Sequence, residues 1–222
     1  KARRYAAAHG LPYIAVEDGF LRSLRLGCED AAPLSLVVDY TGIYYDATGP
    51  SDLETLLNSE GWQTPELMAS AQKALSAILL HHLSKYNHAP DAAPGVLGAA
   101  EPGAPRVLII DQTVGDASVS LGLADASSFI AMLTEAKKRF PHAWLYVKTH
   151  PDVLARKKKG YLTEAAKHYG ATLIAEDVAP LSLLEQADVV YCVTSQMGFE
   201  ALMLGKDVHC FGMPFSAGWG IT

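Results

Sequence analysis

Short apolar runs alternate with segments of helical periodicity in the second half of the chain. The runs have the length and the Val, Ile, Leu and Tyr content of buried strands, at 107–111, 144–148, 173–175, 189–193 and 208–211. Apolar residues recur at helical spacing between them, at 127–140, 160–169, 181–187 and 195–204. This alternation is typical of a parallel sheet covered by helices on both faces. We therefore predict a Rossmann-like α/β lobe over residues 106–222.

The first half is less regular. We predict strands at 13–16 and 34–39, and a helix over 65–82 that Thr64 caps and a proline opens. A following stretch rich in Ala, Pro and Gly has no periodicity and predicts a linker over 88–105. The expected architecture is α/β, with parallel sheets in two lobes: an incomplete N-terminal lobe at 1–87, the linker, and the C-terminal lobe at 106–222.

The start of the chain indicates a fragment. Residues 1–9 are basic and Ala-rich, lack an initiator Met, and lead into a short apolar run that breaks at Glu17. We interpret them as the end of a helix before a strand rather than as a signal peptide. No apolar run approaches the roughly 20 residues that a membrane-spanning helix needs.

Composition narrows the function classes. The 222 residues are 50% hydrophobic, enough for one large or two small cores, and the formal net charge of -6 argues against a nucleic-acid partner. Cys28, Cys192 and Cys210 are scattered and form no CxxC pair, which predicts reduced thiols in a cytosolic protein. The sequence also lacks the GxGxxG, GxxxxGK[ST], HExxH, GxSxG and DxD motifs, which argues against dehydrogenases, P-loop enzymes, zincins, α/β-hydrolases and a metal-dependent nucleotide-sugar site.

Polar residues follow nearly every predicted strand, where ligands bind in doubly wound sheets. Glu17 and Asp18 lie side by side before Gly19. They predict either general acid–base chemistry on a hydroxyl or a solvated turn. Gly19 and Arg22 are candidate substrate-binding residues of the same turn, and Arg22 is close enough in sequence to hold a carboxylate or an anionic substrate.

The next strand ends in a polar loop that contains Gln112, Asp116 and Ser118. Asp116 is a candidate nucleophile, a candidate general base, or a turn residue. A second carboxylate near the first is what a two-step, configuration-retaining transfer requires.

His150 follows another strand and precedes Pro151, which fixes the backbone beside it. A histidine there can stabilise a departing phosphate, or serve only as a hydrogen-bonded structural residue. Lys148 adds positive charge if its side chain faces the same site.

A further polar segment opens the helix predicted at 195–204. Free backbone N–H groups at a helix start favour a phosphate, although Ser195 also suits an ordinary N-cap. Glu200 could accept hydrogen bonds from ribose or lie on the surface. The candidate ligand-binding residues of this segment are Thr194, Ser195, Gln196, Gly198 and Glu200.

Longer strings make the chain similar to a known family. The strings are EDGFLRSLRLG at 17–27, PLSLVVDYTGIYYDA at 33–47, LSKYN at 83–87, VKTHPDV at 147–153, VTSQMGFEAL at 193–202 and CFGMPFSAGWGIT at 210–222. Together they resemble the KpsC/LipA-type capsule polysaccharide proteins over essentially the whole chain. The resemblance implies a GT-B-like fold, a β-Kdo transferase that retains configuration, and CMP-β-Kdo as donor with no metal or other cofactor. It also implies a phosphatidylglycerol-linked acceptor at the cytoplasmic face of the inner membrane, and a second transferase module in a longer parent.

The same resemblance implies roles for individual residues. Asp116 is the nucleophile, Glu17 and Asp18 are the acid/base pair, and His150 faces the CMP phosphate. The nucleotide-binding edge comprises Ser195, Gln196 and Glu200. Ser216 departs from the family pattern, in which we expect an aromatic residue before AGWG. The smaller serine predicts a looser wall of the site at this position.

Two other functions stay open from the residues. An inverting transferase for CMP-sialic acid or another nucleotide sugar would need one base and could dispense with Asp116. A non-catalytic module would only bind a nucleotide or a partner within a larger protein.

Overall fold

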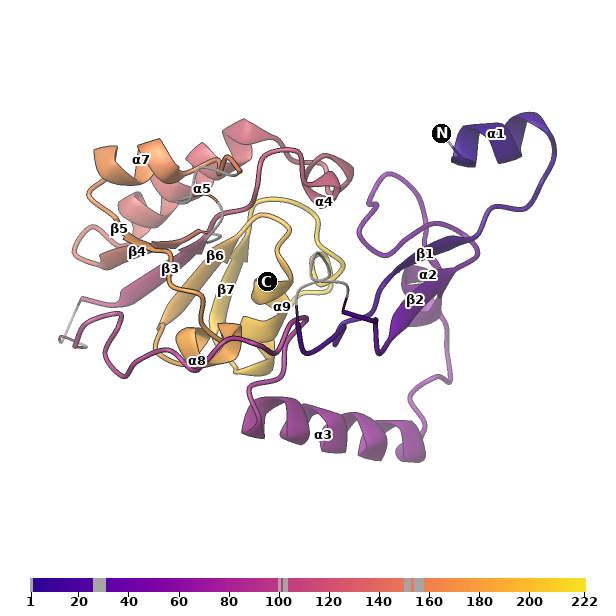
Figure 1. Ribbon diagram of the computed structural model, residues 1–222, viewed down its shortest axis with the longest axis horizontal. Coiled ribbons are helices and arrows are strands. Elements are labelled where there is room, and N and C mark those ends of the chain that lie inside the picture. The colour runs from indigo at the N-terminus through magenta and orange to yellow at the C-terminus, as the bar shows by residue number, and fades with distance from the viewer. Residues whose placement is uncertain (1, 26–30, 100, 102–103, 150–152, 154–157) are drawn as a thin grey trace.

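The computed structural model describes residues 2–25, 31–99, 101, 104–149, 153 and 158–222. Figure 1 shows a larger C-terminal lobe built around one sheet and a smaller N-terminal part beside it. The chain therefore has the two-part α/β architecture that the sequence predicts.

The C-terminal lobe contains five parallel strands in the order β5-β4-β3-β6-β7. Their bounds are β3 Arg106–Ile110, β4 Trp144–Lys148, β5 Thr172–Ile174, β6 Val189–Cys192 and β7 Asp207–Cys210. The chain winds outward from β3 in one direction and then from β6 in the other, so the topological switch point lies between these two strands. The Rossmann-like prediction for this lobe is confirmed.

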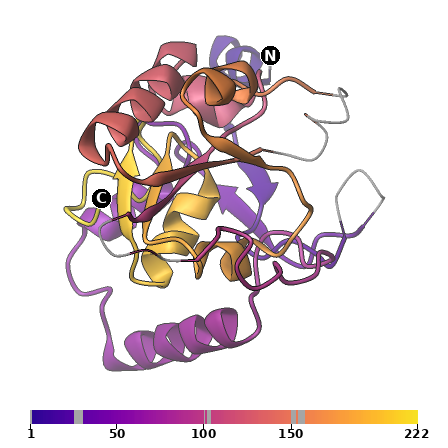
Figure 2. The same cartoon turned by 90° about the vertical axis from the view of Figure 1, so that its left-hand side faces the viewer.

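Helices cover both faces of the sheet (Figures 1 and 2). Their bounds are α4 Ala117–Leu121, α5 Ala126–Arg139, α7 Thr163–His168, α8 Pro180–Leu184 and α9 Gln196–Met203. Strand β4 shows how the faces are divided: Leu145 and Val147 join the core beneath α5 and α7, whereas Tyr146 joins the core beneath α8 and α9. This alternation follows from the two-residue repeat of a strand.

The N-terminal part consists of α1 Ala2–Ala8, β1 Ala15–Asp18, β2 Leu36–Asp39, α2 Asp52–Asn58 and α3 Pro65–Leu80. Here β1 pairs antiparallel with β2. The prediction of a parallel sheet in the first lobe is therefore wrong for these two strands. Parallel neighbours need a crossover, usually a helix. The described parts of the connection, 19–25 and 31–35, contain no helix and turn the chain back on itself.

Helix α3 begins as predicted. The Thr64 hydroxyl accepts a hydrogen bond from the backbone N–H of Leu67 at 3.2 Å, and Pro65 occupies the first turn. The helix has 16 residues, none of them buried. Across the described parts of the chain, no helix has the length and apolarity to cross a bilayer.

The predicted linker at 88–105 packs on the C-terminal lobe. Leu97 is fully buried in the core beneath α8 and α9, and its carbonyl accepts a hydrogen bond from the Tyr146 hydroxyl at 2.6 Å. The backbone N–H of Ala92 donates to the Ser182 hydroxyl at 2.8 Å. This segment therefore covers part of one sheet face as well as connecting the lobes.

Candidate active site between the lobes

A hydrogen-bonded pair marks the topological switch point. Gln112 follows β3 and Thr194 follows β6. The Gln112 amide nitrogen donates to the Thr194 hydroxyl at 3.0 Å, and the Thr194 backbone N–H donates back to the Gln112 amide oxygen at 3.0 Å. The two strand ends where a doubly wound sheet binds its ligand are thus joined directly.

Asp116 projects from the loop after β3 and caps helix α4. Its Oδ1 accepts hydrogen bonds from the Ser118 backbone N–H at 2.9 Å and the Ser118 hydroxyl at 2.8 Å. Among the described residues, its Oδ2 has only a long contact of 3.4 Å with the Gln112 amide. The carboxylate is therefore held through one oxygen, while the other is available to a ligand.

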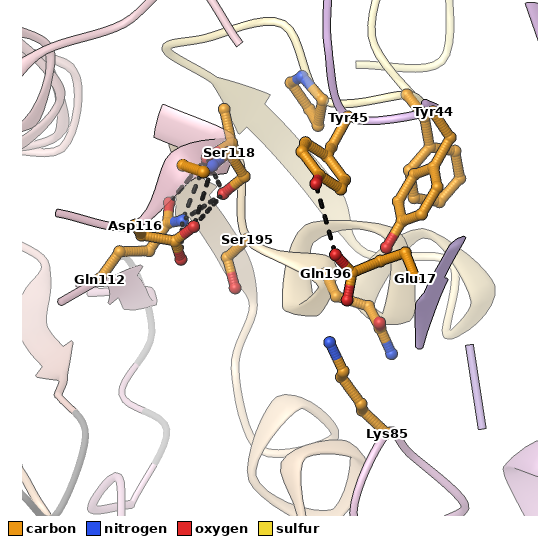
Figure 3. A pocket seen from close by; sticks show the side chains of 13 residues that line it. Glu17, Tyr44, Tyr45, Lys85, Gln112, Asp116, Ser118, Ser195 and Gln196 are labelled. Carbon is orange, nitrogen blue, oxygen red and sulfur yellow. Dashed lines mark hydrogen bonds between the residues drawn. The ribbon is translucent and has the colours of Figure 1, made fainter. Parts of the chain in front are cut away.

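A cavity of about 310 Å³ lies between the lobes (Figure 3). The N-terminal part lines it with Glu17, Tyr44, Tyr45 and Lys85. The C-terminal lobe lines it with Gln112, Asp116, Ala117, Ser118, Thr194, Ser195, Gln196, Pro214 and Phe215. The structure thus brings Glu17 and Asp116, which are far apart in sequence, to one cavity.

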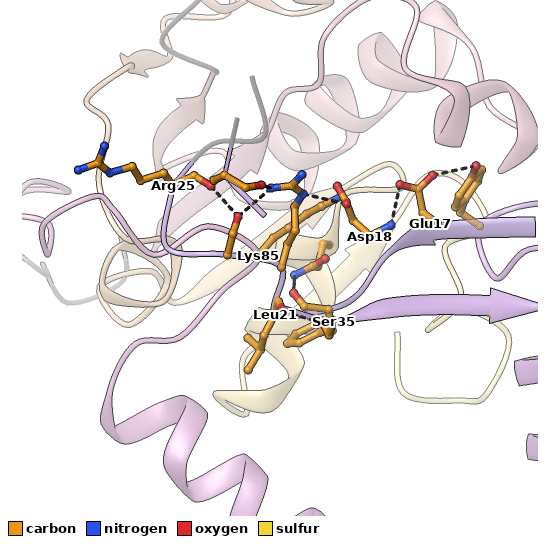
Figure 4. A network of polar contacts seen from close by, with 12 residues as sticks. Glu17, Asp18, Leu21, Arg25, Ser35 and Lys85 are labelled. Carbon is orange, nitrogen blue, oxygen red and sulfur yellow. Dashed lines mark hydrogen bonds and ion pairs between the residues drawn. The ribbon is translucent and has the colours of Figure 1, made fainter. Parts of the chain in front are cut away.

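The structure separates the two neighbouring carboxylates of strand β1. Glu17 lines the cavity and accepts a hydrogen bond from the Tyr45 hydroxyl at 3.3 Å. Asp18 instead pairs with the Arg22 guanidinium at 2.8 Å and with the Lys85 ammonium at 3.8 Å (Figure 4). Successive side chains of a strand point to opposite sides, so the pair could not face one ligand together.

Gly19 and Arg22 shape the turn after β1 and do not line the cavity. A Cβ atom on Gly19 would lie 2.1 Å from the Ser35 hydroxyl oxygen, so only glycine fits this close approach. The Arg22 guanidinium also donates to the Ala31 carbonyl and the Ser23 hydroxyl, each at 2.9 Å. Both residues were predicted to bind substrate; here their contacts are within the protein.

Aromatic rings line the boundary between the lobes. Tyr44 contacts Phe215 with ring centroids 5.7 Å apart, and Phe199 lies between Phe215 and Phe20 at 4.9 and 5.6 Å. Burial, with added repulsion from Glu17, raises the pKa of Tyr44 to about 12, so its hydroxyl stays protonated at neutral pH. Ser216, where we expected an aromatic residue, is buried, and its neighbour Phe215 supplies the ring.

A second cavity, of about 270 Å³, adjoins the first and shares Gln112, Asp116 and Ser195 with it. Lys148 lines it and donates to the Glu176 carbonyl at 2.8 Å; burial lowers the pKa of this lysine. His150 and Pro151 lie outside the described residues. Because the two cavities share these three lining residues, we treat them as two parts of one candidate site.

Asp111 is a site residue that the sequence did not single out. It lines the second cavity at the end of β3 and accepts hydrogen bonds from the backbone N–H groups of Tyr161 and Leu162 at 3.0 and 3.2 Å, and from the Thr149 hydroxyl at 3.3 Å. Burial raises the pKa of this carboxyl group despite these bonds. The only signal in the sequence was a charged residue closing an apolar run.

Helix α9 starts at the site. Ser195 lines both cavities and caps the helix, accepting a hydrogen bond from the Met197 backbone N–H at 3.3 Å. Gly198, predicted to contact substrate, is instead buried against β6, where an added Cβ would lie 2.4 Å from the Cys192 sulfur. Its role here is close packing of helix on strand.

Glu200 is 1% exposed and lines neither cavity, so it is not placed for the predicted contact with ribose. Its Oε1 accepts hydrogen bonds from the Ser84 hydroxyl at 2.5 Å and from the Gln196 amide at 3.1 Å, and Gln196 also donates to the Phe20 carbonyl at 3.2 Å. Its Oε2 has no hydrogen-bond partner among the residues that the structure describes. Through these buried hydrogen bonds, Glu200 links helix α9 of the C-terminal lobe to Ser84 of the N-terminal part.

We expect the stability of the protein to depend on pH through Glu200. Burial raises the pKa of this carboxyl group, so the folded state binds its proton more tightly than the unfolded state. Stability should then fall as the pH rises from about 4 through the raised pKa. Glu200→Gln cannot titrate, so its Tm relative to wild type should increase between pH 4 and pH 8. Glu164→Gln, at an exposed helical position, is the control, and a Tm difference independent of pH would contradict the prediction.

Metal-binding side chains do not gather at the site within the described part of the chain. There, no group of three or more His, Cys, Asp or Glu residues is arranged to hold an ion. Cys192 and Cys210 are free thiols on paired strands, with their sulfur atoms 3.5 Å apart.

The fold and the site define a GT-B-like α/β protein whose cavity lies between two lobes. The family model described as capsule polysaccharide biosynthesis protein matches residues 1–222, and the chain belongs to this family. It is of the KpsC/LipA type, as the sequence strings predict.

Relatives and solved structures agree with this assignment. The capsule polysaccharide modification protein LipA of Neisseria meningitidis serogroup B is 53% identical over the whole chain, and the lipopolysaccharide-processing protein LpsZ of Rhizobium meliloti is 39% identical. The chain spans 32% of that LipA and 50% of LpsZ. The solved Thermosulfurimonas dismutans KpsC beta Kdo 2,4 transferase is 53% identical with a TM-score of 0.92, covering all of this chain and 68% of that one. The beta Kdo 2,7 transferase of the same KpsC is 28% identical with a TM-score of 0.66, covering 98% of this chain and 65% of that one.

Proposed function

We propose that this chain is the core of a β-Kdo transferase module that retains anomeric configuration and uses CMP-β-Kdo as donor. The observation that carries the proposal is that Glu17 and Asp116 line the same cavity between the lobes. Two carboxylates on either side of a sugar site are the requirement of a double displacement. The likeness to the solved beta Kdo 2,4 transferase supports the same linkage class for this chain.

Asp116 acts as the nucleophile in this proposal. Its less engaged oxygen, Oδ2, attacks the anomeric carbon of Kdo, the bond from that carbon to the CMP phosphate breaks, and the electron pair leaves with CMP. The hydrogen bonds from Ser118 hold the carboxylate in position for attack. A covalent Kdo–Asp116 ester results.

Glu17 acts as the acid/base. It takes the proton of the acceptor hydroxyl, whose oxygen attacks the same carbon and releases Asp116 as a carboxylate. Two inversions leave the configuration unchanged.

The second cavity holds the CMP part of the donor. Lys148 supplies positive charge there, and Ser195 places the start of α9 between the two cavities. An ammonium group and backbone N–H groups stabilise the phosphate as it leaves. His150 keeps its expected role toward that phosphate.

The family supports a place in capsule assembly. We propose a phosphatidylglycerol-linked Kdo acceptor, action at the cytoplasmic face of the inner membrane, and a second transferase module in the parent protein, of which this chain is a part.

Intact-mass measurement after incubation with CMP-Kdo, without acceptor, tests the proposal. We expect the protein to gain the mass of one Kdo residue and to lose it when acceptor is added. Turnover without any covalent adduct would support an inverting transferase on the same scaffold. Absence of CMP binding by calorimetry would instead support a non-catalytic module.

A further inference from the structure

The first cavity, which Glu17 and Asp116 line, has an unusual balance of charge for a site that is to hold an acidic sugar. Glu17 and Asp116 both line it, and a sugar carboxylate would bring a third negative charge. Uncompensated charges in a partly enclosed site are costly. Among the described residues that line this cavity, Lys85 is the sole Lys or Arg.

The backbone of Lys85 is fixed beside the turn after β1. Its carbonyl accepts hydrogen bonds from the backbone N–H groups of Arg22 at 3.0 Å and Ser23 at 3.2 Å. In Figure 3 the ammonium group points into the cavity, toward the space between Glu17 and Gln196. The side chain therefore starts from an anchored segment and reaches the ligand space.

The contacts of Lys85 leave its charge available. Among the described residues its nearest carboxylate is Asp18, at 3.8 Å, which is too long for a good hydrogen bond, and the Tyr86 ring centroid lies 5.9 Å from the ammonium nitrogen. The Arg22 guanidinium already compensates Asp18 at 2.8 Å. A ligand carboxylate can therefore recruit Lys85 without leaving Asp18 unpaired.

The second cavity has its own cation, Lys148. A donor built from a nucleoside monophosphate and a sugar acid carries two anionic groups, and the two adjoining cavities offer one lysine to each. We propose that Lys85 binds the carboxylate of the donor sugar and makes the site selective for acidic sugars. This inference rests on the proposed function and adds a specificity-determining residue to it.

Calorimetric titration with CMP, with CMP-Kdo and with the carboxamide of CMP-Kdo tests the role of Lys85. All titrations use the Asp116→Asn background, because this variant binds the donor without forming the covalent adduct, and the Lys85 substitutions are made in it. With Lys85 present, CMP-Kdo should bind about 10- to 100-fold more tightly than its carboxamide, the scale of one charge-assisted contact. Lys85→Met should lose that difference while binding CMP within about twofold of the Asp116→Asn parent. Lys85→Arg should keep most of it, because the charge is retained.

The outcomes separate the inference from the proposed function. A Lys85→Met variant that still prefers the carboxylate over the carboxamide would overturn the inference alone. If the Lys85→Met substitution weakened the binding of CMP, CMP-Kdo and the carboxamide equally, Lys85 would have a structural role, and the inference would be overturned as well. A protein with Lys85 present that binds neither CMP nor CMP-Kdo would overturn the proposed function itself.

Discussion

Asp116→Asn should reduce Kdo transfer by roughly four orders of magnitude or more, the scale on which enzymes lose activity without their covalent nucleophile. An amide oxygen is too weak a nucleophile to form the ester with the sugar. The Asn side-chain oxygen can still accept the hydrogen bonds from Ser118 that now reach Asp116 Oδ1. The variant should therefore fold and bind CMP, and its intact mass should not change on incubation with CMP-Kdo.

The chain offers a closely matched control for this variant. Asp125 is also an exposed N-cap, and its Oδ1 accepts from the Ser127 backbone N–H at 2.7 Å and from the Ser127 hydroxyl. It caps α5 and lines neither cavity. Asp125→Asn should keep full transfer activity. Near-normal turnover by Asp116→Asn would show that no covalent step passes through this residue.

Glu17→Gln should slow transfer by about two to four orders of magnitude, the usual contribution of a general base. The expected defect lies in the second step, because the acceptor hydroxyl keeps its proton. The covalent adduct should therefore still form and should persist after acceptor is added. Intact-mass measurement over time, with and without acceptor, separates this outcome from loss of the nucleophile.

Asp18→Asn is the matched comparison for Glu17→Gln. It changes the neighbouring carboxylate, which forms an ion pair with Arg22 and does not line the cavity. We expect at most a stability loss of about 1 kcal/mol, since the pair is partly exposed, and little change in the acid/base step. A larger activity loss in Asp18→Asn than in Glu17→Gln would reverse the assignment of the base.

The sequence predicted the C-terminal lobe well because its strands are buried on both faces. Continuous apolar runs such as Trp144–Lys148 are hard to place anywhere except inside a parallel sheet, and this strand has the predicted bounds. The polar residues after β3 and β6, Gln112 and Thr194, were also identified. Their pairing depends on strand order, which an apolar pattern does not contain.

The N-terminal part was less predictable. The strands at 15–18 and 36–39 are short and partly exposed, so the pattern could not distinguish antiparallel from parallel pairing. Glu17 lines the cavity whereas Asp18 forms an ion pair with Arg22, and this difference follows from the strand pairing and from the position of Arg22 in the turn.

Long-range contacts decided the remaining differences at the site. The sequence predicted Glu200 as a surface or ribose-binding residue. It is instead buried at the lobe boundary, where it accepts a hydrogen bond from Ser84, which is 116 positions away. Lys85 lay within a string quoted for the family, yet only the packing of that segment beside β1 aims its ammonium group at the cavity. Local sequence carries no information on which distant segments pack against Glu200 or beside Lys85.

The row of rings from Phe20 through Phe199 and Phe215 to Tyr44 has a consequence for catalytic distance. Rings in contact can slide past one another at small cost, but they cannot interpenetrate. The row therefore acts as a spacer between Glu17 on one lobe and Asp116 on the other. In the proposed mechanism, the thickness of a sugar that fits between these two carboxylates is set by aromatic packing outside the reacting atoms.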